Sequence, residues 1–269
     1  MIGLKGQARL ELDDGRSAVC PNNVNSQVMT GLINKIASPS YQYPDELVPT
    51  RISLQDSSGA SEFKDISNRS LATSGSLVYL DFHAPGFAPA TSSNQPVQAF
   101  EIKLMSSTST IATANMMAAE INPNPNIYAY QTANVSYRLT LSGANTDWME
   151  RLLRVVQGKE FMTSNNWVAD NDQFVTVNHS KLYYGSSFLA SSSFEMSVEG
   201  NQQQQFRLTV DGDVSFSQLE SSYTPNEIKY YALDTKGQAQ LIGTATVSEV
   251  SQFATGDNIK VPFSIIMSK

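Results

Sequence analysis

Four aspartates in the second half of the chain could bind a cation, and they form two pairs. Asp170 and Asp172 are separated by an asparagine, and Asp211 and Asp213 are separated by a glycine. Carboxylate and amide oxygens are the ligands that Ca²⁺ takes in proteins, so both pairs are candidate metal ligands. Each pair also has a structural interpretation: an Asp-Gly step favours a tight hairpin, and the first pair lacks the glycine and closing glutamate of a complete calcium loop. The sequence leaves calcium binding and turn formation open at both places.

The residues that enzymes use as nucleophile and base are scarce. The chain has two histidines, His83 and His179, and a serine triad would need one of them as its base. No serine lies in a Gly-x-Ser-x-Gly motif, no glycine-rich phosphate loop is present, and Cys20 follows Ala18 and Val19 as a small core residue would. Nothing marks a carboxylate of either acidic pair as the buried acid of a glycosidase. We therefore predict that the protein is not an enzyme.

Tyrosine side chains offer another kind of site, a flat surface on which a sugar could stack. The candidates are Tyr128 and Tyr130, Tyr183 and Tyr184, and Tyr230 and Tyr231. Tyrosine is also an ordinary strand residue, and adjacent positions of a strand point to opposite faces. Packing within strands is therefore the favoured interpretation.

Composition and charge exclude several classes of protein. Of the 269 residues, 41% are hydrophobic and only 16% are charged, which is enough apolar content for a core and too little charge for a coiled coil. The net charge is −7 and no cluster of Lys and Arg is present, so direct nucleic-acid binding is not expected. A single cysteine excludes an intrachain disulfide and suits a reducing compartment. Because no secretory signal and no apolar run of about 18 residues is visible, we expect a soluble protein made in the cytosol.

Alternation of apolar and polar residues dominates the chain and predicts strands. It is clearest over residues 2–12, 97–104 (with Phe100, Ile102 and Leu104 on one face), 135–141, 206–210 and 259–265. Weaker candidates cover residues 51–55, 77–82, 174–177, 182–189, 194–198, 214–219, 228–233 and 240–247. Many short strands separated by Gly, Asn, Ser and Pro turns are typical of β-sandwiches and barrels. The predicted fold is mainly β.

Two segments show helical spacing instead. Apolar residues recur every three or four positions over 24–37, after a possible cap at Asn22 or Asn23, and over 147–157, after a possible cap at Asn145 or Thr146. A third segment, residues 108–121, is rich in Ala and Met and is also predicted to be helical.

The order of these elements predicts two similar halves. A clean strand precedes a helix twice, at 2–12 and 24–37 and again at 134–141 and 147–157. An Asn-Pro-Asn-Pro-Asn run between them marks a boundary, which gives domains 1–133 and 134–269. Eight short strands in each half would form one jelly roll each. The proline-rich loops 38–50 and 84–96 either meet a partner or ligand, or cover the ends of the barrels.

The full chain resembles the major capsid proteins of the corticoviruses, tailless icosahedral phages of marine bacteria with an internal membrane. The resemblance rests on the overall length, the strand that opens with residues 1–6, the strand–helix duplication and the closing strand 259–266. It covers the chain from end to end and includes no diagnostic motif.

This resemblance implies a fold, an assembly and a location. The fold would be a double jelly roll, two barrels side by side with short helices, of the lineage shared with adenovirus hexon. Three copies would form a pseudo-hexagonal capsomer, and capsomers would tile a shell over a lipid bilayer in a calcium-dependent particle. The partners would be other copies, vertex spike and membrane-associated virion proteins, with no direct nucleic acid, after synthesis in the host bacterial cytoplasm. The short loops of this chain do not predict tall towers on the outer surface.

Two other functions remain as alternatives. A carbohydrate-binding β-sandwich module of a phage tail or spike predicts a ligand-sensitive tryptophan, and Trp167 is the freer candidate because Trp148 lies in a helical stripe. A hydrolase, the third-ranked reading, predicts that substitution of Asp170 or Asp172 abolishes turnover.

Overall fold

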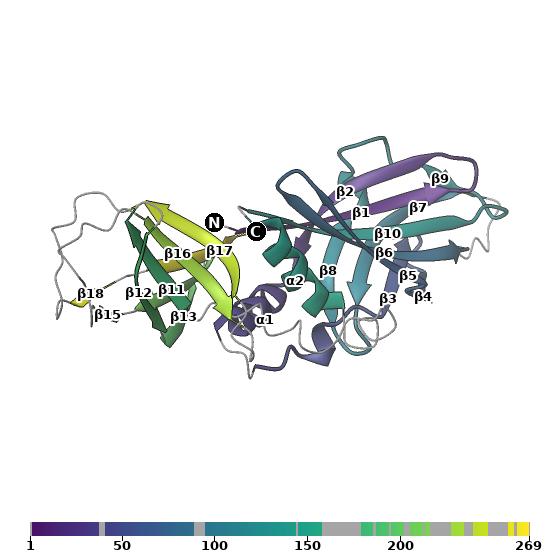
Figure 1. Cartoon of the computed structure of the whole chain (residues 1–269). Coiled ribbons are helices and arrows are strands. Elements are labelled where there is room, and N and C mark those ends of the chain that lie inside the picture. The colour runs from purple at the N-terminus through teal and green to yellow at the C-terminus, as the bar shows by residue number, and fades with distance from the viewer. Residues whose placement is uncertain are drawn as a thin grey trace. The chain divides into compact units, whose positions relative to one another are not determined.

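The computed structural model describes residues 2–37, 41–88, 95–143 and 145–157, together with separate strands between 179 and 268 (Figure 1). These residues form antiparallel sheets and two α-helices, which confirms the mainly-β prediction. They fall into two compact units. The N-terminal unit comprises the described residues of 3–31 and 43–157, and the C-terminal unit comprises those of 32–42 and of 179–268.

The N-terminal unit is a two-layer antiparallel sandwich. One layer has the strand order β5 (Asn68–Ser74), β6 (Leu77–Phe87), β10 (Ala133–Ser142), β1 (Ile2–Leu12) and β2 (Ser17–Val24). The other has the order β8 (Thr110–Asn115), β7 (Val97–Met105), β3 (Arg51–Asp56) and β4 (Ser61–Asp65), and the short β9 (Asn126–Ile127) pairs with one end of β7. Strand β2 belongs to both layers, since it pairs with β1 along most of its length and with β8 at its last two residues.

Alternating burial explains why these strands form. Along β1 every second residue is buried, and β10 repeats the pattern beside it. The register places Leu10 opposite Val135 and Ala8 opposite Tyr137, while Tyr137 also lies opposite Phe82 of β6. All five side chains are fully buried. An apolar row across three strands therefore fixes the register, because a shift by one residue would expose all of it.

The predicted domain boundary at 133/134 does not separate the two compact units. It falls at the start of β10, which pairs with β1 on one side and β6 on the other. Helix α2 (Thr146–Gln157) packs against β5, β6 and β10, so it also belongs to the N-terminal unit. Hydrogen-bond ladders on both sides of β10 decide this assignment.

Successive strands of the sandwich pair as hairpins. β1 with β2, β3 with β4, β5 with β6 and β7 with β8 are each antiparallel neighbours. A jelly roll instead places most sequence-adjacent strands in opposite sheets. The connections of this unit are therefore shorter and more local than those of the predicted jelly roll.

Both firmly predicted helices are present. In α1 (Ser26–Ala37) the cap is Asn25 rather than Asn22 or Asn23, since its Oδ1 accepts a hydrogen bond from the amide of Gln27 at 3.0 Å. In α2 the predicted cap Asn145 is confirmed, because its Oδ1 accepts from the amide of Trp148 at 2.9 Å. These bonds satisfy amides that the helix leaves unpaired at its first turn.

The third predicted helix, 108–121, is wrong. Its first part is strand β8, followed by a single 3-10 turn at Met116–Ala118. β8 pairs with both β7 and β2, and Ile111, Ala112 and Ala114 are buried. Tertiary pairing overrides the weak helical preference of the alanines, and the β-branched Thr and Ile residues suit a strand.

The prediction that Phe100 shares a face with Ile102 and Leu104 is also wrong. The pairing of β3 with β7 skips Phe100, because Gln55 lies opposite Glu101 and Asp56 opposite Ala99. A β-bulge of this kind places one extra residue on a strand. Phe100 is consequently 45% exposed, whereas Ile102 and Leu104 are buried.

The described part of the 38–50 loop packs on the rest of its unit. Residues 45–47 form a 3-10 turn in which Leu47 is buried. The carbonyl of Pro49 accepts from Arg69 at 2.7 Å, and the amide of Thr50 donates to Met105 at 2.8 Å. This part of the loop covers the sandwich. Of the 84–96 loop, residues 84–87 continue β6, and residues 89–94 lie outside the described residues.

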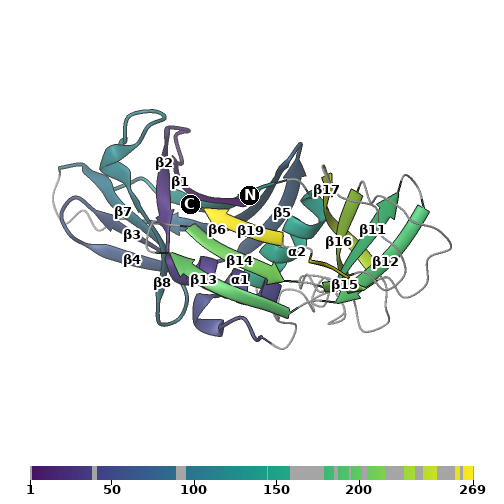
Figure 2. The ribbon, with the colours of Figure 1, turned by 90° about the vertical axis from the view of Figure 1, so that its left-hand side faces the viewer.

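The C-terminal unit contains three groups of paired strands. One is β12 (Ser187–Ser193), β11 (His179–Tyr184), β16 (Glu227–Leu233) and β17 (Ala239–Thr246). The second is β13 (Glu195–Asn201), β14 (Gln205–Asp211) and β19 (Phe263–Ser268), which Figure 2 shows side by side. The third is β15 (Asp213–Ser215) with β18 (Asn258–Lys260).

Two predicted strands of this unit differ from the structure. The predicted strand 259–265 is two strands, β18 and β19, which belong to different sheets. Pro262 lies between them and has no N–H to donate to a ladder. The predicted strand 182–189 is the hairpin of β11 and β12, and the predicted strand 174–177 lies outside the described residues.

The role of β10 can be tested by shortening one buried side chain. We expect Leu139→Ala to lower the free energy of unfolding by about 2–5 kcal/mol, because it leaves a cavity between β1 and β6. Thr140→Ala, on the opposite face of the same strand, should cost less than about 1 kcal/mol. Urea denaturation of both variants gives the comparison, and equal losses would contradict the burial assignment.

Candidate ligand-binding site

The structure describes only one of the two predicted acidic pairs. Asp170 and Asp172 lie outside the described residues. Asp211 is the last residue of β14 and Asp213 is the first of β15. Because β14 pairs with β13 and β19 while β15 pairs with β18, the hairpin expected at this Asp-Gly step is not formed. Among the described residues no group of three or more His, Cys, Asp or Glu could hold a metal ion, and calcium binding stays a prediction.

The other candidate residues of the sequence lie in strands or in the core. His83 is in β6 and His179 in β11. Cys20 is buried, with its Sγ 3.0 Å from the carbonyl oxygen of Asn115, and burial together with the nearby Glu120 raises the pKa of the thiol. Cys20 is thus the core residue that the sequence predicts.

Among the aromatic candidates, Trp148 is buried on α2, as the helical stripe predicts. Tyr230 is buried, and burial raises its pKa to about 12, so this ring lies within a sheet rather than on an open surface. Tyr183 and Tyr184 lie in β11, and Tyr231 is the neighbour of Tyr230 in β16. Trp167 lies outside the described residues.

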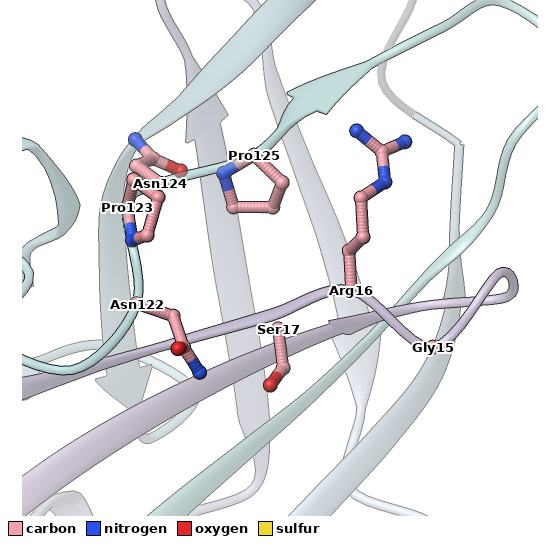
Figure 3. A pocket seen from close by; sticks show the side chains of 7 residues that line it. All are labelled: Gly15, Arg16, Ser17, Asn122, Pro123, Asn124 and Pro125. Carbon is pink, nitrogen blue, oxygen red and sulfur yellow. The ribbon is translucent and has the colours of Figure 1, made fainter.

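A cavity of about 470 Å³ lies beside the turn between β1 and β2 (Figure 3). It is lined by two chain segments that are about 105 residues apart in the sequence: Gly15, Arg16, Ser17, Asn122, Pro123, Asn124 and Pro125. Figure 3 shows the side chains of Arg16 and Ser17, which come from the first segment, and those of Asn122 to Pro125, which come from the second. The lining combines a cation, a hydroxyl, amides and two proline rings.

The first wall is the β1–β2 turn. The amide of Gly15 donates to the carbonyl of Leu12 at 3.0 Å, and the amide of Leu12 donates to that of Arg16 at 2.8 Å. Gly15 has a φ of 86°, a conformation that a side chain would strain. This turn therefore fixes where Arg16 and Ser17 leave the hairpin.

Asp14 and Arg16 form an ion pair at this wall. The Oδ2 of Asp14 accepts from Nε of Arg16 at 2.8 Å, and its Oδ1 accepts from the Arg16 amide at 3.1 Å. These hydrogen bonds lower the pKa of Asp14 to about 2, and the same pairing raises the pKa of Arg16 above its ordinary value. At neutral pH the two charges cancel within the pair.

Gln131 connects the turn to Tyr128, which follows the second lining segment in the sequence. Its Nε2 donates to Oδ2 of Asp14 at 2.6 Å, and its Oε1 accepts from Arg16 and from the amide of Tyr128, each at 3.1 Å. The side chain is buried and all of its hydrogen-bonding groups point at these partners. Gln131 thereby holds Arg16 and Tyr128 in fixed positions.

Tyr128 and Tyr130 form an aromatic surface next to the ion pair. Their ring centroids are 5.8 Å apart and the ring planes differ by 12°. The guanidinium of Arg16 lies 6.0 Å from the centroid of the Tyr128 ring, at the limit of a cation–π contact. Tyr130 is 81% exposed and Tyr128 38% exposed, so this pair is accessible to a ligand.

The second wall is the Asn-Pro-Asn-Pro segment, which the sequence predicts as a domain boundary. Ile121, just before it, forms a bridge with Val19 of β2. The side-chain amide of Asn124 donates to the carbonyl of Ala99 at 2.6 Å, and Gln98 donates to the Asn124 carbonyl at 3.1 Å. The segment is therefore anchored to β2 and β7 and forms part of one unit.

Of the residues around this cavity, the sequence analysis names only Tyr128 and Tyr130 as possible ligand contacts. Arg16, Asn122 and Gln131 were missed because Arg16 lies more than 100 positions before the other two residues in the sequence. The available signals were the Asp-Asp-Gly-Arg turn and the Asn-Pro repeat, both of which indicate irregular backbone with polar side chains.

No family model, no curated protein and no solved structure matches this chain. In the described parts of the chain, no helix has the length and apolar character needed to cross a membrane.

The ion pair can be tested by titration. We expect NMR of the side-chain carboxyls to give Asp14 a pKa near 2, and Arg16→Gln to return it toward 3.8 because the hydrogen bonds that stabilise the charged form are lost. A lowered pKa means that Asp14 stabilises the fold above pH 3.8 and that this contribution disappears as the pH falls toward 2.

Arg9→Gln is the matched control, because Arg9 lies on the same hairpin and pairs with Glu11 instead of Asp14. An Asp14 pKa that responds equally to both substitutions would contradict the specific pairing.

Proposed function

We propose that this chain is the major capsid protein of a membrane-containing icosahedral phage, with three copies in each pseudo-hexagonal capsomer. In this proposal the protein acts by self-assembly and not by catalysis. It would reside in the virion shell above the internal lipid membrane, next to other capsomers, vertex spike proteins and membrane-associated proteins, without binding nucleic acid directly. The proposal comes from the resemblance of the sequence to corticovirus major capsid proteins, and two exposed aromatic side chains of the N-terminal unit support it.

The supporting observation is a pair of exposed phenylalanine side chains on the layer β8-β7-β3-β4, which together are called the apolar surface. Phe63 of β4 is 53% exposed and Phe100 of β7 is 45% exposed. Large aromatic side chains are enriched in protein interfaces, and burying each would remove apolar surface from water. The low fraction of charged residues, 16%, also favours lateral contacts, since the centres of interfaces are depleted of charge.

The edge of this layer favours contact through side chains. β4 is the last strand of the layer, and an unpaired edge would otherwise invite another strand to add to it. Lys64 and Glu62 form an ion pair at 2.7 Å on this edge, and Glu62 also accepts from the amide of Ala88. Charged side chains on an edge oppose strand addition, so a neighbouring copy would bind the apolar surface instead.

The double jelly roll is part of this proposal. Two compact units and a two-layer antiparallel sandwich in the N-terminal unit support it. Calcium, bound by Asp170 and Asp172 or by Asp211 and Asp213, would bridge neighbouring copies that each carry a net charge of −7.

Self-assembly has a direct test in the solution mass. We expect light scattering to give about three times the chain mass of 29.4 kDa. Phe63→Ser combined with Phe100→Ser should shift the mass toward the monomer while the urea midpoint stays nearly unchanged, because both side chains are already exposed.

Tyr130→Ser is the matched control, since it removes an exposed aromatic ring elsewhere on the same unit and should leave the mass unchanged. A wild-type chain that stays monomeric at high concentration would overturn the capsomer proposal.

The calcium bridge has a separate test. We expect assemblies larger than the trimer to require Ca²⁺ and to dissociate on chelation, and Asp170→Asn with Asp172→Asn to reproduce the effect of the chelator. Asp45→Asn with Glu46→Gln removes the same charge at an exposed turn and should not. Assemblies that are unaffected by chelation would refute this bridge, whatever the result for the trimer.

A further inference from the structure

We propose that the cavity beside the β1–β2 turn, together with the Tyr128–Tyr130 surface, is a binding site for a neutral carbohydrate. This inference is independent of the capsid proposal, because it rests on the contacts of the N-terminal unit alone. Four properties of the site carry it: its charge, its hydrogen-bonding groups, its apolar surfaces and its rigidity.

The charge of the site selects against ions. Arg16 is the only cation that lines the cavity, and it is neutralised by Asp14 at 2.8 Å. An anionic ligand would have to compete with this carboxylate, whose pKa of about 2 keeps it ionised at neutral pH. A metal ion would find no carboxylate among the lining residues, and the nearby Asp14 is already paired with Arg16. A ligand without net charge fits best.

The polar groups of the site match hydroxyls. A sugar hydroxyl both donates and accepts, and it is best bound by a mixture of donors and acceptors. The cavity provides one guanidinium, the hydroxyl of Ser17 and the side-chain amide of Asn122. Asn122 has a φ of 61°, which asparagine tolerates better than most residues.

The apolar surfaces match the other face of a sugar. A pyranose ring has C–H groups on its faces, which pack on aromatic rings whose π faces carry partial negative charge. Tyr130 presents such a face at 81% exposure, and Pro123 and Pro125 add two further flat rings to the cavity wall. The cavity volume of about 470 Å³ lies within the range of small-ligand sites.

The site is held in place before a ligand arrives. Gln131 makes one hydrogen bond each with Asp14, Arg16 and Tyr128, and Asn124 binds the second wall to Ala99. Less conformational entropy is therefore lost on binding than at a loop without such contacts. In a shell protein this site would allow the particle to bind a surface polysaccharide of a cell.

The test is saturation-transfer NMR on the full chain with four neutral disaccharides, maltose, cellobiose, lactose and chitobiose, and with a sulfated heparin disaccharide for comparison. We expect at least one neutral disaccharide to bind. Tyr130→Ala should weaken its binding at least tenfold, whereas Tyr130→Phe, which keeps the ring, should retain it. Phe63→Ser is the control for loss of an exposed aromatic, since β4 lies at the far end of its layer from β2.

Three results would overturn the proposal: no binding of any neutral disaccharide, binding that Tyr130→Ala leaves unchanged, or stronger binding of the sulfated disaccharide. Arg16→Gln is a second variant, located on the wall formed by the β1–β2 turn, and it should also weaken binding. The trimer test is separate, because Tyr130→Ala is not expected to change the solution mass and Phe63→Ser is not expected to change sugar binding.

Discussion

The ladder between β1 and β10 is the constraint on which the rest of the N-terminal unit depends. It joins residues about 130 positions apart through ten opposed pairs, from Gly3 with Ser142 to Leu12 with Ala133. Its inward side chains are buried and fix the register. The cavity begins where the ladder ends, because the amide of Asp13 donates to the carbonyl of Thr132 directly beyond the last pair. The apolar core thus determines which loops meet at the site.

Two arginines of this unit are each paired with a nearby aspartate. Arg16 is paired with Asp14, and Arg138 of β10 binds Asp81 of β6 through two hydrogen bonds of 2.7 and 2.8 Å. Both pairs are partly exposed, so they contribute little to stability and act mainly by fixing geometry and removing net charge. Only 16% of the residues are charged. A low fraction of charge suits both lateral contacts between copies and recognition of hydroxyl groups.

The two proposed surfaces use different elements of one sandwich. The apolar surface for self-association includes Phe63 on β4, at one edge of its layer, and the carbohydrate site lies at the turn that leads into β2, at the other edge. Three strands separate β4 from β2 in this order. Phe63 is therefore remote from the carbohydrate site, whereas Phe100 follows Ala99, whose carbonyl accepts a hydrogen bond from Asn124 of the cavity wall. Substitution of Phe63 alone is thus the change that separates assembly from ligand binding.

The sequence by itself determined most of the described strands, the two helices and most of the buried faces, because periods of 2 and 3.6 residues report which side of an element is apolar. It did not determine which strands pair with one another. The strand at 108–121, the bulge at Phe100 and the place of β10 each depend on hydrogen-bond ladders with strands distant in the sequence. The candidate site was predictable only through Tyr128 and Tyr130. Its central hydrogen bonds join Gln131 to residues 115 and 117 positions earlier, and only the tertiary structure brings such residues together.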